Sequence, residues 1–262
     1  SRIAVAADAL LLERRYARTT QIAALQKHLA IDLDALRALA LPGGGYAPWP
    51  GARNADTYSS AFCAIALARA KVAGANVDPD LAAVRVFLHS RLNDPTADAG
   101  TSEVPRAQVR LEALETLGLL GDIRDDHLAD IYALRDRFSY YEQIELARHL
   151  LRLPTWRSAG AALRAKLLER VGLTARAAAV NIPGSSIETA TAGQAQLVGM
   201  LVDAHADATL VDTAFRALLA RRGRDGAWPS PSDTAEAMDS VVAYAMLESS
   251  PPNFSATARV GQ

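Results

Sequence analysis

The chain has 262 residues, which is long enough to bury a sizeable core. Half of the residues are hydrophobic but only 6% are aromatic, because alanine and leucine carry the apolar content, and both favour helix over strand. Twenty-eight basic side chains balance 29 acidic ones, which leaves no electrostatic footprint for nucleic acid or an anionic membrane. Composition therefore predicts an all-α protein without a nucleic-acid partner.

The first apolar run predicts a helix over residues 1–16. It is not expected to be a signal peptide or a membrane span, because Asp8, Glu13, Arg14 and Arg15 interrupt it. We also expect no direct membrane insertion elsewhere, since charges divide every apolar stretch. The chain begins at Ser1 rather than Met, which fits a domain taken from a larger protein.

Apolar residues then recur at helical spacing and predict roughly eleven or twelve helices in all. Their stripes lie within residues 22–36, 58–66, 81–88, 114–120, 128–134, 144–151, 163–171, 197–201, 210–218 and 241–246. Most breaks between them are short, so consecutive helices are expected to be antiparallel neighbours. Longer polar loops cover 41–55, 93–104 and 222–232, and an irregular stretch covers 180–186. Apolar pattern resumes on both sides of each, so we expect one domain over residues 1–262.

Two of the loops resemble each other and suggest an internal repeat. Gly44-Gly45-Tyr46-Ala47-Pro48-Trp49-Pro50 leads to Asp56-Thr57, and Asp225-Gly226-Ala227-Trp228-Pro229 leads to Asp233-Thr234. A weaker third copy runs from Ser185 to Ala190. Repeated helical hairpins cannot bury their faces singly, so they are expected to stack into an open solenoid or close into a ring.

The aromatic residues of these loops have two interpretations. Tyr46, Trp49 and Trp228 could form a ligand-binding wall, but single aromatic residues after glycine turns are ordinary packing anchors. We therefore expect them to plug the ends of the helical layer, with Asp56 and Asp233 at the starts of the helices that follow.

No complete catalytic site, metal site or cofactor site is expected. Asp122, Asp126 and Asp130 fall on one face of a predicted helix, near Asp125 and His127, but Asp122 after Gly121 also suits a helix N-cap. Ser185 and Ser186 lack the closing glycine of a nucleophile elbow, and the glycines at 43–45 lack the lysine of a phosphate loop. The only cysteine, Cys63, lies on an apolar helix and is expected to be a buried, inert thiol.

The run from Gly43 to Leu92 resembles the thioester-containing domain of bacterial alpha-2-macroglobulins. It has a Gly-Gly-Gly-Tyr-x-x-Trp loop, followed by Asp56, Ala61, Phe62, Ala68, Ala70, Gly74 and Val77. The C-terminal half is similar to a stretch shared by macroglobulins and complement components. It runs from Ser185-Ser186-Ile187-Glu188-Thr189-Ala190 through Arg222-x-x-Asp225-Gly226-Ala227-Trp228 to Asp233-Thr234-Ala235-x-Ala237.

The resemblance implies an α/α toroid of about six helical hairpins, similar to terpenoid cyclases. It implies a part in broad-spectrum protease trapping after bait cleavage, with neighbouring β-sandwich domains and target proteases as partners. It also implies a periplasmic location, with a lipid anchor on the parent protein.

In that family the trap uses a thioester formed within a Cys-x-Glu-Gln motif, and this chain lacks the motif, since Ala64-Ile65-Ala66 follows Cys63. A Ser-Arg pair like Ser1-Arg2 follows the motif in the family. The motif is therefore expected just upstream of Ser1, either trimmed off or lost from the parent.

Two other interpretations remain open. A terpene cyclase or prenyltransferase-like enzyme would share the toroid, and Asp225-Gly226-Ala227-Trp228 is similar to the repeats of those enzymes, although no Asp-x-Asp-Asp motif occurs. A non-catalytic scaffold or interaction module is the third possibility. A wet acidic interior would favour the enzyme, and a packed aliphatic interior would favour the macroglobulin.

Overall fold

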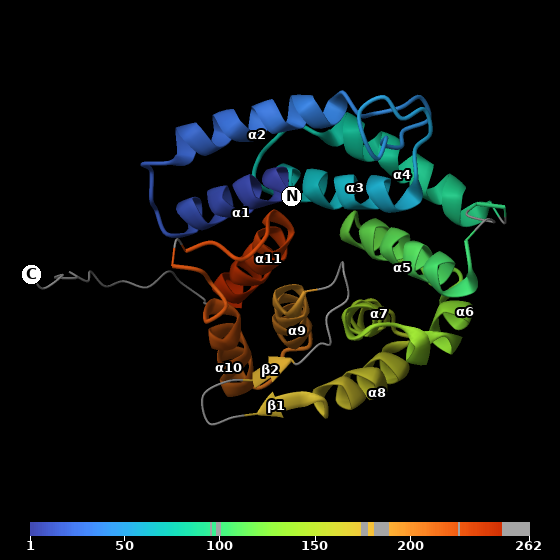
Figure 1. Ribbon diagram of the computed structural model, residues 1–262, viewed down its shortest axis with the longest axis vertical. Helices are drawn as coiled ribbons and strands as arrows, with labels where there is room; N and C mark the ends of the chain where they lie inside the picture. The colour runs from blue at the N-terminus through green and yellow to red at the C-terminus, as the bar shows by residue number, and fades with distance from the viewer. Residues whose placement is uncertain (95, 98–100, 174–177, 181–188, 225, 248–262) are drawn as a thin grey trace, which may run out of the picture.

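Six helices form the inner wall of a closed ring in the computed structural model (Figure 1). The structure describes residues 1–94, 96–97, 101–173, 178–180, 189–224 and 226–247. Each inner helix packs on the next, and the last returns to contact the first. The inner helices are α1 (Arg2–Arg15), α3 (Thr57–Val72), α5 (Glu103–Leu119), α7 (Tyr140–Arg152), α9 (Ala190–Asp203) and α11 (Pro231–Leu247).

The remaining helices of the described residues form an outer layer, each packed on the inner helix that precedes it in the chain. They are α2 (Ile22–Arg37), α4 (Asp78–Asn93), α6 (Leu128–Ala133), α8 (Arg157–Leu168) and α10 (Ala208–Leu219). A 3₁₀ helix covers Arg135–Arg137. This arrangement confirms the predicted all-α toroid built from helical hairpins.

Burial patterns explain which helices lie inside. In α9 every residue from 191 to 201 is buried, as expected for a helix with neighbours on several faces. The outer helix α2 buries only Leu29 and Leu33, which form a single narrow contact with the layer beneath. Inner helices such as α9 are also rich in alanine and glycine, which lets their backbones approach closely.

Local signals set the helix ends. Asp56 caps α3, because its carboxylate accepts a hydrogen bond from the backbone N–H of Ser59 at 2.7 Å. A capping box of Ser139 and Glu142 starts α7. Gly74 follows α3 with φ of +91°, a conformation that suits glycine and turns the chain into α4.

The structure departs from the predicted helices in two places. Residues 171–173 and 178–180 form a two-stranded antiparallel sheet, β1 (Val171–Leu173) and β2 (Ala178–Val180), in which Val171 pairs with Val180. The helix predicted near Asp122 does not begin until Leu128, after His127 in a left-handed conformation. Among the described residues no helix is long and apolar enough to cross a membrane.

The first aromatic loop packs through Tyr46 and not through Trp49. Tyr46 is 2% exposed, and its backbone N–H donates to Ser60 Oγ at 2.9 Å. Gly44 makes this approach possible, because a Cβ there would lie 2.2 Å from the carbonyl oxygen of Ala83. Trp49 is 64% exposed, so its prediction as a plug is wrong. Tyr46 fills the buried position, and Trp49 begins a surface turn closed by the Ala52 N–H.

The second loop packs through Trp228, which is 7% exposed. Its indole Nε1–H donates to the Leu218 carbonyl at 3.1 Å, and the Arg222 guanidinium lies 5.4 Å from the ring centroid. Asp225 and the third repeat's residues 185–188 lie outside the described residues. The two aromatic loops lie on different sides of the ring (Figure 1).

Asp233 is not the cap of its helix, although Asp56 caps the equivalent one. The hydroxyl of Ser230 accepts the Asp233 N–H at 3.0 Å and donates to the Asp233 carboxylate at 2.9 Å. The other carboxylate oxygen of Asp233 accepts from Thr189, the N-cap of α9. Asp233, which is 2% exposed, therefore joins the starts of α9 and α11.

We predict that Trp228→Ala lowers the free energy of unfolding by about 3 to 5 kcal/mol, because it removes a buried ring and leaves a cavity. Denaturant unfolding measures the change. Trp49→Ala is the matched control and is expected to stay within about 0.5 kcal/mol of the wild type, since Trp49 is exposed. Equal effects of the two substitutions would contradict this assignment.

We propose that residues 1–262 form one domain, because α1 contacts α11, the last helix of the described residues. Limited proteolysis is then expected to cut loops without releasing half-sized folded pieces. Two stable fragments that separate after a cut near the middle of the chain would overturn the proposal.

Candidate functional site

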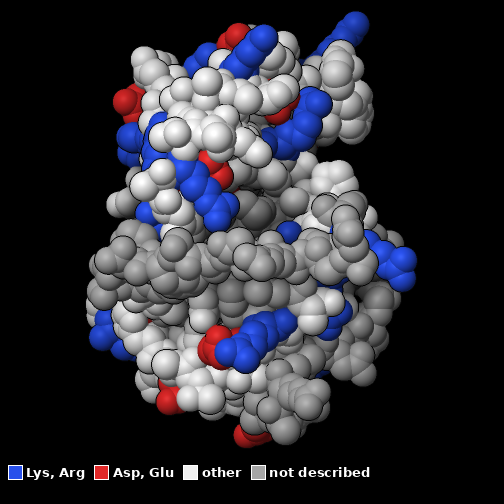
Figure 2. Space-filling view, turned by 90° about the vertical axis from the view of Figure 1, so that its left-hand side faces the viewer, with Lys and Arg blue, Asp and Glu red and all other residues white. Residues whose placement is uncertain are grey.

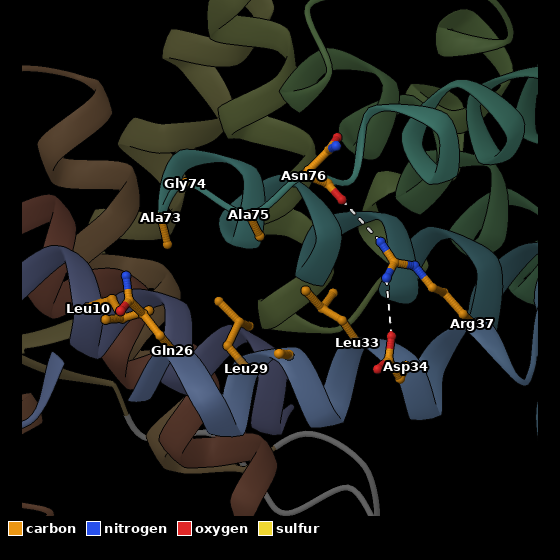
Figure 3. Close-up of a pocket in the computed structure, with 11 residues that line it drawn as sticks. Leu10, Gln26, Leu29, Leu33, Asp34, Arg37, Ala73, Gly74, Ala75 and Asn76 are labelled. Atoms are coloured by element: carbon orange, nitrogen blue, oxygen red, sulfur yellow. Dashed lines mark hydrogen bonds and ion pairs between the residues drawn. The ribbon is translucent and has the colours of Figure 1, made fainter. Parts of the chain in front are cut away.

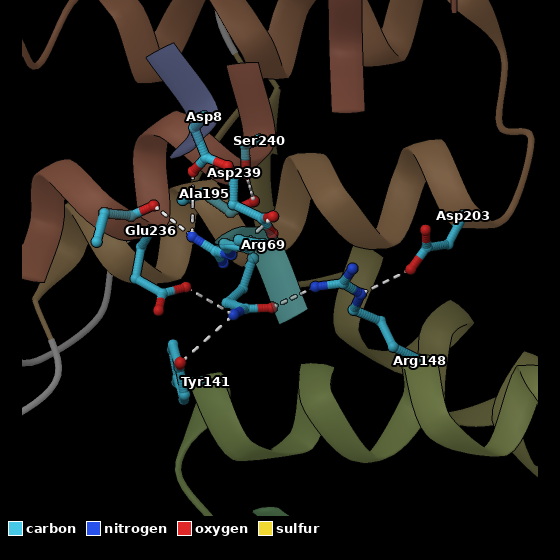
Figure 4. Close-up of polar contacts among 11 residues, drawn as sticks. Asp8, Arg69, Tyr141, Arg148, Ala195, Asp203, Glu236, Asp239 and Ser240 are labelled. Carbon is cyan, nitrogen blue, oxygen red and sulfur yellow. Dashed lines mark hydrogen bonds and ion pairs between the residues drawn. The ribbon is translucent and has the colours of Figure 1, made fainter. Parts of the chain in front are cut away.

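Polar side chains from the inner helices meet along the axis of the ring (Figure 4). They come from helices far apart in sequence and are bonded to one another. Sequence patterns did not distinguish these residues from other polar side chains. Asp8, for example, is a single charge within an apolar run. Its position among alanines was the signal in the sequence that could have marked it.

Arg69 of α3 is the first centre of this axial network. Its Nη1 donates to Asp8 Oδ2 and to the Ala235 carbonyl, each at 3.2 Å. Its Nη2 lies 3.2 Å from Asp239 Oδ1. One guanidinium therefore ties α3 to both the first helix and the last.

Gln196 and Arg148 form the second centre. Arg148 Nη1 donates to Gln196 Oε1 at 2.7 Å, and its Nε donates to Asp203 Oδ2 at 2.8 Å. The Gln196 amide donates to Glu236 Oε2 at 2.9 Å and to the Tyr141 hydroxyl at 3.3 Å. These bonds join α7, α9 and α11.

Three further glutamates of α5 and α7 face the same axis and repel one another. Burial raises the pKa of Glu112 to about 8, and nearby carboxylates add to this shift. Burial also raises the pKa of Glu115 to about 7, although Arg148 and Arg152 oppose the shift. Burial, Glu112 and Glu115 together raise the pKa of Glu145 well above its ordinary value. Glu115 Oε1 is buried and has no hydrogen-bond partner among the described residues.

The interior therefore matches neither of the two alternatives set out from the sequence. It is acidic rather than aliphatic, yet its carboxyls share the space with Arg69 and Arg148, which bond to several of them. The ion pairs join helices to each other. Such a network fixes the orientation of the helices and keeps buried carboxyls protonated. Its bonds cross-link one helix to another.

Cys63 of α3, predicted to be a buried thiol, is partly buried and packs against the core. Burial nevertheless raises its pKa to about 11, while the nearby amino group of Ser1 opposes the shift. The thiol is therefore almost entirely protonated at neutral pH, which makes it a weak nucleophile.

The acidic residues near Asp122 are spread over a turn rather than one helical face, because α6 begins only at Leu128. Asp122 Oδ2 pairs with His89 Nε2 at 2.7 Å, and Asp126 pairs with Arg124 at 2.5 Å. Among the described residues, no group of three or more His, Cys, Asp or Glu side chains is arranged so that it could hold a metal ion.

A hollow of about 330 Å³ lies between α1, α2 and the link from α3 to α4 (Figure 3). Its walls are mostly apolar, with Leu10, Leu29 and Leu33 pointing inward. At one end Arg37 bonds to Asp34 and to the Asn76 carbonyl. On the face in Figure 2, basic and acidic side chains of the described residues are intermixed.

Comparison with known proteins gives one sequence relative and several structural ones. No family model matches the chain. It is 30% identical over 265 residues to an alpha-2-macroglobulin homolog from Nostoc sp., an alignment that covers 99% of this chain and 14% of the relative. The chain therefore spans a small part of the length of that protein.

The fold matches bacterial alpha-2-macroglobulins. For native Escherichia coli alpha-2-macroglobulin from domain MG7 to the C-terminus, the TM-score is 0.66 at 14% identity over 92% of this chain and 39% of that one. For Salmonella alpha-2-macroglobulin reacted with methylamine, the TM-score is 0.64 at 15% identity over 88% and 15%. These findings confirm the resemblance of the chain to the thioester-containing domain of the bacterial alpha-2-macroglobulins.

Proposed function

We propose that this chain is the ring-shaped module of a larger macroglobulin and that it contributes to protease trapping after bait cleavage. The supporting observation is the 30% identity to the Nostoc homolog along 99% of the chain. The structural relatives include an Escherichia coli alpha-2-macroglobulin activated by porcine elastase. The proposed partners are neighbouring β-sandwich domains and target proteases, and the proposed location is the periplasm, with a lipid anchor on the parent protein.

In this proposal the chain supplies no acyl group and is not an enzyme. Cys63 is the only cysteine, and Ala64-Ile65-Ala66 follows it in place of Glu-Gln. A thioester requires a thiol and a glutamine side chain held together as an activated acyl donor. The raised pKa of Cys63, near 11, also disfavours its use as a nucleophile.

A toroid enzyme is the alternative that the acidic axis raises. A cyclase would need an acid group aimed into a ligand cavity, whereas Glu236 accepts from Gln196, and Asp8 and Asp239 pair with Arg69. These bonds connect helices α1, α3, α9 and α11 and leave the carboxyls engaged with the protein itself. The macroglobulin assignment therefore has the better support.

The trapping role predicts a specific change in protease activity. When the natural protein that carries this chain is mixed with elastase, the trapped enzyme is expected to keep its activity on a small chromogenic peptide. It is expected to lose most of its activity on a large protein substrate, because a cage excludes large molecules. Equal loss on both substrates, or no loss on either, would contradict trapping.

The isolated chain tests the absence of the acyl donor. Methylamine is expected to add no mass, as measured by intact-protein mass spectrometry. Native Cys63 is expected to react with a thiol reagent at neutral pH roughly a hundredfold more slowly than after unfolding, because its pKa lies about two units above the ordinary value. A methylamine adduct would contradict the proposal that this chain carries no acyl donor. Rapid labelling of native Cys63 would contradict its assignment as an unreactive thiol.

A further inference from the structure

The ring closes where α1 meets α11, and at that junction Arg69 faces three carboxyl groups, of which Glu236 and Asp239 also interact with Arg148 of α7. Arg69 bonds to Asp8 of α1 and to Asp239 of α11, each at 3.2 Å. Glu236, also of α11, acts on both Arg69 and Asp8. The two helices that complete the ring thus place three carboxyl groups, which carry the same charge when ionised, close to one another.

The three carboxyls differ in their access to water. Asp8 is 2% exposed, whereas the side chain of Asp239 is 40% exposed and can be solvated while it pairs with Arg69. Glu236 accepts a hydrogen bond from Gln196 of α9. Asp8 is therefore the carboxyl with the least help from water.

Among the charged groups of the described residues that act most strongly on Asp8, Arg69 is the one cation, and the amino group of Ser1, at the start of α1, acts on Arg69. From α3 the group that faces it is Arg69, and from α11 the groups are Glu236 and Asp239. From α2, Asp32 pairs with Arg2 at the start of α1, at 3.2 Å. Tyr141 of α7 adds a hydroxyl near Arg69.

A buried carboxyl in such surroundings is best accommodated with a proton. One guanidinium offsets one carboxylate, and a second ionised carboxylate without water or another cation is costly. Burial raises the pKa of Asp8 to about 7. Arg69 lowers this pKa, but Asp239 and Glu236 raise it and so oppose the effect of Arg69.

We propose that the junction of α1, α3 and α11 is a pH-sensitive clasp, closed when Asp8 is protonated and loosened when Asp8 ionises. In the closed form the neutral Asp8 accepts the Arg69 hydrogen bond while Asp239 carries the balancing charge. Ionisation adds an uncompensated charge between α1 and α11 and weakens the contact that closes the ring.

The sign of the effect follows from the direction of the shift. The folded chain keeps the Asp8 proton up to about pH 7, whereas the unfolded chain releases it near pH 4. The contribution of this group to stability is therefore complete below about pH 4 and is lost as the pH rises through 7. The clasp is strong in acid and weak in alkali.

Hydrogen exchange of the whole chain tests the proposal. After correction for intrinsic exchange rates, protection of amides in α1 and α11 is expected to fall about tenfold or more between pH 5.5 and 8.5 in the wild type. Asp8→Asn mimics the neutral carboxyl and is expected to diminish that fall, while the buried glutamates of α5 still titrate in the same range. Asp34→Asn, which neutralises an exposed carboxyl on α2 that pairs with Arg37 rather than Arg69, is the matched control and is expected to retain the full fall.

Protection that is independent of pH in the wild type, or an undiminished fall in Asp8→Asn, would overturn the clasp. A second measurement needs no variant. The carboxyl ¹³C signal of Asp8 in the wild-type chain is expected to titrate with a midpoint near neutral pH, and a midpoint near pH 4 would equally refute the proposal.

Discussion

Arg69 joins α3 to α1 and α11, the two helices whose contact closes the ring. A toroid of hairpins has no neighbour for its first and last helices unless they meet. Here α1 and α11 meet across the guanidinium, which bonds to a side chain of each and to the Ala235 carbonyl. The alternative for repeated hairpins is an open solenoid, whose end faces would stay exposed.

The rest of the axis extends the same principle. Arg148 and Gln196 join α7, α9 and α11 with directional bonds, and Gly199 leaves space for the Arg148 side chain, since a Cβ there would lie 3.0 Å from its Nη1. Apolar packing between alanine-rich helices tolerates sliding, whereas charged hydrogen bonds fix their relative positions. The interior thus connects the helices to one another, which agrees with the proposed non-enzymatic role of the module.

Sequence patterns predicted the layers well because apolar spacing is local: the stripe through Leu81, Val84 and Leu88 is visible within one helix. They failed where the outcome depends on distant partners. Trp49 and Tyr46 share one loop, and only the position of Ser60 and Ala83 decides which is buried. Asp233 resembles the cap Asp56, but Ser230 takes that role and Thr189 engages the carboxylate. The pairing of Arg69 with Ala235 spans 166 residues and has no local signature.

The most direct test of the account is the stability of Arg69→Met beside Arg37→Met. Arg69 is a largely buried side chain, 15% exposed, with three contacts, whereas Arg37 makes ion pairs at the surface with Asp34 and Asp80. Removing Arg69 leaves Asp8 and Asp239 without their partner, so the free energy of unfolding is expected to fall by about 3 to 5 kcal/mol. Arg37→Met is expected to cost about 1 kcal/mol or less. If the two variants unfold at the same denaturant concentration, the ring does not depend on the Arg69 contact.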